Sequence, residues 1–134
     1  MSGFDDLFAA ALQARDRAYA PYSRFKVGAA VRGVSGRVYA GCNVENAAYP
    51  QGLCAEAGAI AAMVLAGETQ VAEVCVVGEG PALVTPCGGC RQRLREFAGP
   101  ETPVHVCGPD GLRRSFTMDA LLPASFGPGN LGAA

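Results

Sequence analysis

Two short cysteine-containing stretches, each at the beginning of a helix pattern, constrain the fold of this chain more than any other feature. The first is LCAEAG at residues 53–58, and the second is TPCGGCRQ at residues 85–92. Helix N-termini carry unpaired N–H groups and partial positive charge. If these two helix starts lie side by side, Cys54, Cys87 and Cys90 meet around one point.

The order of helix and strand patterns predicts an α/β chain. A helix over residues 3–18 is followed by a hairpin of two strands over residues 26–33 and 37–44. Further helices are predicted at residues 54–67, 87–99 and 117–123, and further strands at residues 71–78, 102–108 and 112–116. This order predicts a three-layer α-β-α fold with helices on both faces of a five-stranded mixed sheet. The tail from residue 124 is predicted to be loop-like, and residues 1–134 are expected to form a single domain.

Composition and charge narrow the possible functions. Half of the residues are hydrophobic and 17% are charged, which is typical of a soluble globular protein. Apolar runs fall short of the ~18 residues of a membrane span, and the N-terminus lacks the basic region of a signal peptide. We therefore expect a cytoplasmic protein without a membrane partner. A net charge of −1 favours a small neutral substrate over nucleic acid.

The spacing of the three cysteines indicates a catalytic zinc site. Cys87 and Cys90 are three residues apart, so a helix places them on one face, while Cys54 begins the other helix. A helix N-terminus lowers the pKa of a thiol and favours the thiolate that binds metal. Three protein ligands leave a fourth position on zinc for water, whose pKa the metal lowers toward ~7. Glu56 cannot share the helix face of Cys54, so it is predicted to take the proton of this water.

Plainer interpretations of these residues remain open. A buried cysteine is usually a small hydrophobic residue, and a lone C-x-x-C motif is a weak signal. A structural zinc site would need a fourth ligand, and the sequence has no second C-x-x-C motif. Cys42, Cys75 and Cys107 lie in strand patterns among apolar neighbours and are predicted to be core residues. His105 alternates with valines and is predicted to be structural or to face the surface.

Several stretches resemble the small homotetrameric zinc-dependent cytidine deaminases, within the cytidine and deoxycytidylate deaminase family. The zinc-deaminase pattern H-x-E…P-C-x-x-C, in its three-cysteine variant, is matched by CAE at residues 54–56 and PCGGC at residues 86–90. The other matching stretches are PYSRFKVGAAV (21–31), GCNVENAAY (41–49) and LLPASFG (121–127). The resemblance covers nearly the whole chain and implies the cytidine-deaminase-like form of the α-β-α fold.

The resemblance also implies roles for the matching residues. Cys54, Cys87 and Cys90 would bind one Zn²⁺ per chain, and Glu56 would shuttle protons. The implied substrate-binding residues are Phe25, Asn43, Glu45, Ala47, Tyr49, Ala55 and Phe126.

Within this set, Asn43 and Glu45 would hold the ribose hydroxyls, because their side chains leave one side of an extended segment and offer both donors and acceptors. Phe25 would pack against the pyrimidine. Ala47, Tyr49 and Phe126 would reach a neighbouring subunit. The plainer alternatives are an ordinary polar loop for the first pair and core or interface packing for the aromatic residues.

The implied reaction is hydrolytic deamination of cytidine and 2′-deoxycytidine to uridine and 2′-deoxyuridine, with release of ammonia, in pyrimidine salvage. The implied assembly is a homotetramer whose subunits share active sites. One alternative is a related deaminase for an aminonucleoside antibiotic or a modified base. Another is a non-catalytic, zinc-stabilised nucleoside-binding protein. Glu56 argues against the latter, because a structural zinc site needs no acid beside an open position.

Position 57 departs from the family pattern. Many family members have arginine directly after the catalytic glutamate, where this chain has Ala57. Three thiolates around a divalent zinc ion leave net negative charge, which would weaken the metal's pull on water. We expect Arg91, next to Cys90, to supply part of the compensating positive charge.

Overall fold

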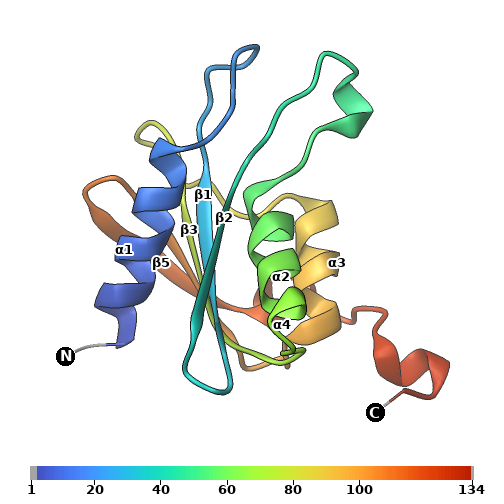
Figure 1. Cartoon of the computed structure of the whole chain (residues 1–134). Helices are drawn as coiled ribbons and strands as arrows, with labels where there is room; N and C mark the ends of the chain where they lie inside the picture. The colour runs from blue at the N-terminus through green and yellow to red at the C-terminus, as the bar shows by residue number, and fades with distance from the viewer. Residues whose placement is uncertain (1–2, 134) are drawn as a thin grey trace.

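A mixed β-sheet with helices on both faces forms the centre of the computed structural model, which describes residues 3–133 (Figure 1). Its strands, in the spatial order β2-β1-β3-β4-β5, are β1 (Gly28–Gly33), β2 (Val38–Cys42), β3 (Val71–Val77), β4 (Pro103–Gly108) and β5 (Gly111–Thr117). The helices are α1 (Gly3–Asp16), α2 (Ala55–Leu65), α3 (Gly88–Phe97) and α4 (Met118–Leu121), with short 3-10 helices η1 (Tyr49–Gln51) and η2 (Pro128–Leu131). None of the helices within residues 3–133 has the length and apolar character needed to cross a membrane.

The predicted five-stranded mixed sheet is confirmed. β3 and β4 are parallel and are joined through α3, whereas β1 pairs antiparallel with both β2 and β3, and β4 pairs antiparallel with β5. The parallel pair requires a crossover connection, which explains why a helix lies between these two strands. The sheet therefore presents two faces, and helices cover both of them (Figure 1).

Each face of the sheet has its own hydrophobic core, which confirms the three-layer arrangement. Along β3, Val74 and Val76 belong to the core beneath α2 and α3, while Cys75 and Val77 belong to the core beneath α1. Successive side chains of a strand point to opposite faces, so a strand covered on both sides is apolar throughout. This is the physical reason for the uninterrupted VCVV run at residues 74–77.

The remaining structural predictions have mixed outcomes. Cys75 and Cys107 are fully buried, as predicted, but Cys42 is partly exposed because it ends the edge strand β2. The prediction of a wholly loop-like tail is wrong for Pro128–Leu131, which forms η2. Proline pre-sets the backbone for a helix start, and the side chain of Asn130 accepts the Gly127 N–H at 2.8 Å.

His105 is structural, as predicted. Its Nε2 lies 2.6 Å from Oε2 of Glu73 on β3, and its Nδ1 lies 2.7 Å from the hydroxyl of Ser115 on β5. The ring of Phe4, on α1, packs edge-on against the imidazole with 5.2 Å between ring centroids. The histidine thus ties three strands together beneath α1.

Gly41 allows β2 to approach α2 closely. A Cβ atom at this position would lie 2.4 Å from the backbone nitrogen of Ala59 and 2.6 Å from the carbonyl oxygen of Ala55. Real Cβ atoms do not approach backbone atoms this closely, so even an alanine would push helix and strand apart. Because α2 begins beside Cys54, this contact also sets the height of the first cysteine above the sheet.

We expect Gly41→Ala to lower the free energy of unfolding by about 1–3 kcal/mol, the usual cost of overpacking. Urea unfolding measures the difference. Gly129→Ala is the matched control, because an added Cβ there meets no atom within 4 Å, and its effect should stay within about 0.5 kcal/mol. Equal stability of the two variants would contradict the proposed close contact.

Candidate functional site

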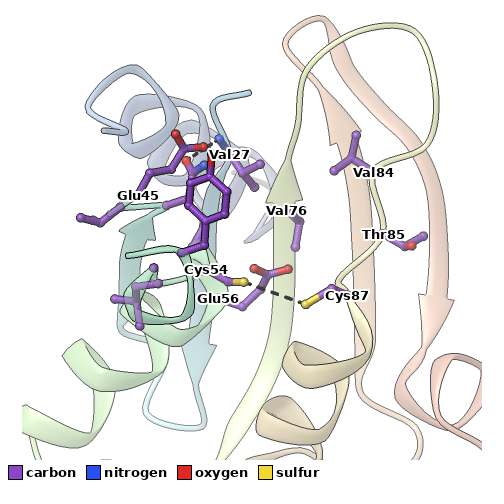
Figure 2. Close-up of a pocket in the computed structure, with 14 residues that line it drawn as sticks. Val27, Glu45, Cys54, Glu56, Val76, Val84, Thr85 and Cys87 are labelled. Carbon is purple, nitrogen blue, oxygen red and sulfur yellow. Dashed lines mark hydrogen bonds between the residues drawn. The ribbon is translucent and has the colours of Figure 1, made fainter. Parts of the chain in front are cut away.

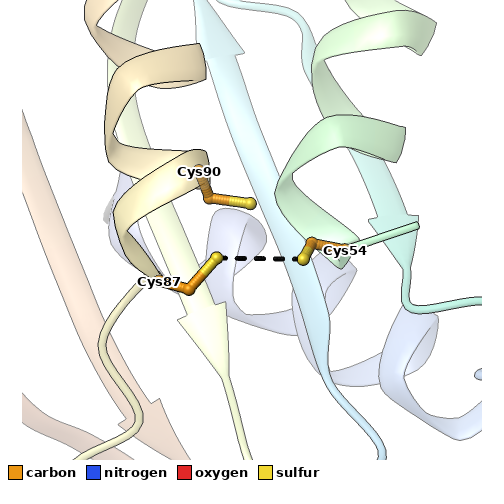
Figure 3. Close-up of side chains that lie close together, drawn as sticks. All are labelled: Cys54, Cys87 and Cys90. Atoms are coloured by element: carbon orange, nitrogen blue, oxygen red, sulfur yellow. Dashed lines mark hydrogen bonds between the residues drawn. The ribbon is translucent and has the colours of Figure 1, made fainter. Parts of the chain in front are cut away.

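The starts of α2 and α3 lie side by side and bring the predicted cysteines together (Figure 3). Cys54 is the N-cap residue of α2, Cys87 is the N-cap residue of α3, and Cys90 lies in the first turn of α3. The three sulfur atoms lie within 4.8 Å of one another, with 3.9 Å between Sγ of Cys54 and Sγ of Cys87. One ion can therefore contact all three sulfurs.

The chemistry of this cluster fits zinc. All three cysteines are free thiols, and thiolate sulfur is a preferred ligand of this metal. Among residues 3–133, no histidine or carboxylate joins the three sulfur atoms as a fourth ligand at this spacing. Cys54 and Cys87 line a cavity, whereas Cys90 is buried behind them. The open side of the cluster therefore faces the cavity, as a catalytic site requires.

The three thiols differ in how easily they ionise. A hydrogen bond from the backbone N–H of Cys90 lowers the pKa of Cys87, as expected at a helix N-terminus. Burial instead raises the pKa of Cys54 and that of Cys90. The prediction that a helix start lowers the pKa is therefore right for Cys87 and wrong for the other two, because desolvation penalises their charged forms more strongly.

Glu56 places a carboxylate beside the sulfur cluster. It lies in the first turn of α2 and is only 5% exposed. Figure 2 shows its side chain beside the Cys54 and Cys87 sulfur atoms, at the inner end of the cavity. Burial raises the pKa of Glu56, so this carboxylate accepts a proton more readily than an exposed one does.

The cavity in front of the cluster has a volume of about 390 Å³, which suits a small molecule. Four of the predicted substrate-binding residues line it, namely Asn43, Glu45, Tyr49 and Ala55. The other lining residues were not predicted from the sequence and are Val27, Val44, Gly52, Leu53, Val76, Val84 and Thr85. Most of them are apolar and carry no chemical signal of their own.

Asn43 and Glu45 tie the loop before β1 to the segment after β2. The amide of Asn43 accepts the Val27 N–H at 2.9 Å and donates to the Phe25 carbonyl at 2.8 Å. The carboxylate of Glu45 accepts the N–H of Tyr22 at 2.9 Å and the hydroxyl of Ser23, and this hydroxyl lowers the pKa of Glu45. Both groups are thereby held in fixed positions on the cavity wall and keep further lone pairs.

Three predicted substrate-binding residues do not line this cavity within the single chain, namely Phe25, Ala47 and Phe126. Phe126 is 58% exposed and lies in the tail, whose backbone is held against α3 by a 2.9 Å hydrogen bond from Gln92 to the Phe126 carbonyl. Tyr49, predicted to reach a neighbouring subunit, lines the cavity of its own chain.

Arg91 does not contact the sulfur cluster. Its guanidinium donates to the carbonyl oxygens of Pro86 and Leu121, both at 2.8 Å, and to the hydroxyl of Thr85 at 3.0 Å. Its hydrogen bonds thus go to oxygen atoms and not to sulfur, and the expectation that its charge offsets that of the cluster stays a prediction. Arg91 instead links the segment before α3 to the end of α4, because its guanidinium N–H groups donate to carbonyl oxygens of both.

The fold and this site define the class of zinc-dependent deaminases, in which cysteine ligands and a separate glutamate stand at adjacent helix starts. The family model "Cytidine and deoxycytidylate deaminase zinc-binding region" matches residues 1–106, which is more than half of the chain. The chain belongs to the cytidine and deoxycytidylate deaminase family, as its motifs predicted.

Similar proteins extend over almost the whole chain. The cytidine deaminase of Sporosarcina psychrophila is 38% identical over 130 residues, 97% of this chain and 96% of that relative. The cytidine deaminase of Mycobacterium tuberculosis H37Rv is 45% identical over 118 residues, 87% of this chain and 84% of that relative. The crystal structure of cytidine deaminase from Burkholderia pseudomallei superposes with a TM-score of 0.87 at 42% identity, covering 94% of this chain and 100% of that one.

We expect Cys87→Ala to lose bound zinc, because only two sulfur ligands would remain. The measurement is the zinc content of each chain after dialysis against a chelator. Cys42→Ala is the matched control, since Cys42 is also a free, incompletely buried thiol but lies outside the cluster. Equal zinc retention by the two variants would contradict the three-cysteine site.

Proposed function

We propose that this chain is a cytidine deaminase that converts cytidine and 2′-deoxycytidine to uridine and 2′-deoxyuridine, with release of ammonia, in pyrimidine salvage. The observation that carries this proposal is the buried carboxylate of Glu56 beside a cluster of three thiols, two of which line a cavity of about 390 Å³. Full-length similarity to proteins named cytidine deaminase supports it.

Cys54, Cys87 and Cys90 would hold one zinc ion per chain. When bound, the metal supplies Lewis acidity that makes water a nucleophile near neutral pH. The position of Cys54 and Cys87 on the cavity wall directs this chemistry toward the substrate.

Glu56 moves the protons of the reaction. Its carboxylate takes one proton from the attacking water and delivers it to N3 of the pyrimidine while the water oxygen bonds to C4. It then takes the proton of the new C4 hydroxyl and passes it to the amino group. The C4–N bond breaks, ammonia leaves and the C4 carbonyl of uridine forms. The raised pKa of Glu56 suits a group that repeatedly accepts and returns a proton.

The cavity wall orients the nucleoside. Asn43 and Glu45 hold the ribose hydroxyls at the outer end of the cavity. Hydrogen bonds within the chain already hold both side chains in place there. Ala55, beside Glu56, contacts the pyrimidine, and the ring of Phe25 packs against it when substrate is bound. The valines Val27, Val76 and Val84 present apolar surface that excludes bulk water.

We further propose a homotetramer in the cytoplasm, in which Ala47, Tyr49 and Phe126 complete a neighbouring subunit's site, Tyr49 doing so from the rim of its own chain's cavity. Tyr49 and Phe126 are 77% and 58% exposed, and exposed aromatic side chains are typical of residues that become buried in interfaces. The six free cysteines suit a reducing compartment.

Replacement of Glu56 tests the proton shuttle directly. Glu56→Gln preserves the shape of the side chain but cannot accept a proton, so turnover should fall by at least about 10²–10⁴-fold. The measurement follows the ultraviolet spectrum of cytidine as it becomes uridine, with zinc content determined on the same samples. Zinc binding should be unchanged, and turnover at the wild-type rate would remove Glu56 from this role.

Glu45→Gln should discriminate between sugars. We expect it to lower kcat/KM for cytidine by about 10–100-fold, because a hydrogen bond to a charged group is lost, and to affect 2′,3′-dideoxycytidine much less. Ser23→Ala is the control, since it loosens the same loop without removing the carboxylate and should affect both substrates equally. A wild-type preference for the dideoxy substrate would instead favour a deaminase for another nucleoside.

A further inference from the structure

Arg93 stands out among the three arginines of α3. Arg91 is bonded to carbonyl and hydroxyl oxygens, and Arg95 donates to the Ser125 hydroxyl at 2.8 Å. Arg93 instead directs its Nη1 to the sulfur of Cys90, at a distance of 3.6 Å. A donor–sulfur distance of this length is a hydrogen bond, because sulfur is larger than oxygen. The contact therefore brings a guanidinium onto one of the three proposed zinc ligands.

Positions 93 and 57 are related by the geometry of the two helices. Arg93 follows Cys90 by three residues, and Ala57 follows Cys54 by three residues. Residues three apart on a helix lie on the same side. Each of these two positions therefore lies about one helical turn after a cysteine, on the same helix face. Arg93 and Ala57 also line the same hollow between α2 and α3. Arg93 reaches the sulfur cluster from this hollow, and position 57 on α2 opens onto the same hollow.

The guanidinium of Arg93 lies close to the first turn of α3. A Cβ at Gly89 would lie 3.4 Å from Nη1 of Arg93, which is close to an ordinary van der Waals contact. The charged group is therefore folded back along its own helix toward Cys90.

We propose that Arg93 is a positioning residue that supplies from α3 the positive charge that an arginine at position 57 would supply from α2. This inference rests on the proposed function, because it concerns the same three-thiolate zinc site. Three thiolates around Zn²⁺ carry net negative charge, and the guanidinium draws electron density from the Cys90 sulfur. Arginine is always protonated, so this charge is constant over the working pH range.

The effect on metal binding follows from the charges. Zinc held by three thiolates would be an anionic complex, which a guanidinium in contact with one of the sulfur atoms stabilises. Groups that hydrogen-bond to metal ligands typically change metal affinity by about 10–100-fold when they are removed. Arg93 is itself exposed to solvent, which screens its charge and places the expected change toward the lower part of this range.

The test compares zinc affinities by competition with a chromogenic chelator, using the reduced full-length chain loaded with zinc. We expect Arg93→Gln to weaken zinc binding about tenfold. Arg93→Lys should restore part of the affinity, since lysine keeps the charge without the planar fork. Ala57→Arg in the Arg93→Gln background should restore it further. Arg17→Gln is the matched control, because it removes the same charge from an exposed residue just after α1.

Each result bears on the proposal. Zinc affinity of Arg93→Gln equal to that of Arg17→Gln would overturn it. A loss of affinity that neither Arg93→Lys nor Ala57→Arg restores would also overturn it, because the role would then be packing rather than charge. In zinc-saturated protein, Arg93→Gln should lower kcat for cytidine while KM stays nearly constant. Failure of the wild type itself to bind zinc would refute the proposed function instead, and the two failures are thus distinguishable.

Discussion

The adjacency of two helix N-termini is the constraint on which the whole site depends. Each of α2 and α3 leads into one of the two parallel strands, so both helices begin at the same edge of the sheet (Figure 1). Ligand sites in open α/β sheets form at the carboxyl edge of parallel strands. Cys54 and Cys87 are themselves the N-cap residues of these helices. The position of each helix start therefore fixes the position of its sulfur atom, with no loop between the helix and the cysteine.

Burial and charge oppose each other at this edge. The same packing that holds Glu56 and Cys90 in place removes them from water and raises the pKa of both groups. An anionic cluster therefore needs positive charge from outside the buried layer. Helix N-termini supply part of it, as the lowered pKa of Cys87 shows, and a guanidinium reaching in from the surface of α3 supplies more without being desolvated itself.

Sequence reasoning predicted what local spacing determines. The cysteine and glutamate positions follow from helix periodicity, and the buried strand β3 follows from its apolar run at residues 74–77. It did not predict the cavity wall, because valines such as Val76 and Val84 look the same whether they face a core or a substrate. The hydrogen-bond partners of Arg91 could not be predicted from the sequence either. A long side chain at a helix start can turn toward sulfur atoms or toward the carbonyl oxygens of another segment.

Arg93 did not stand out in the sequence for a similar reason. A charge acts through its distance from the sulfur atoms and not through its place along the chain. With α2 and α3 packed side by side, position 57 and position 93 open onto one hollow. An arginine at either position would therefore hold its guanidinium near the same sulfur cluster. Ala57 is then no defect of the site, because α3 already carries the charge that α2 lacks.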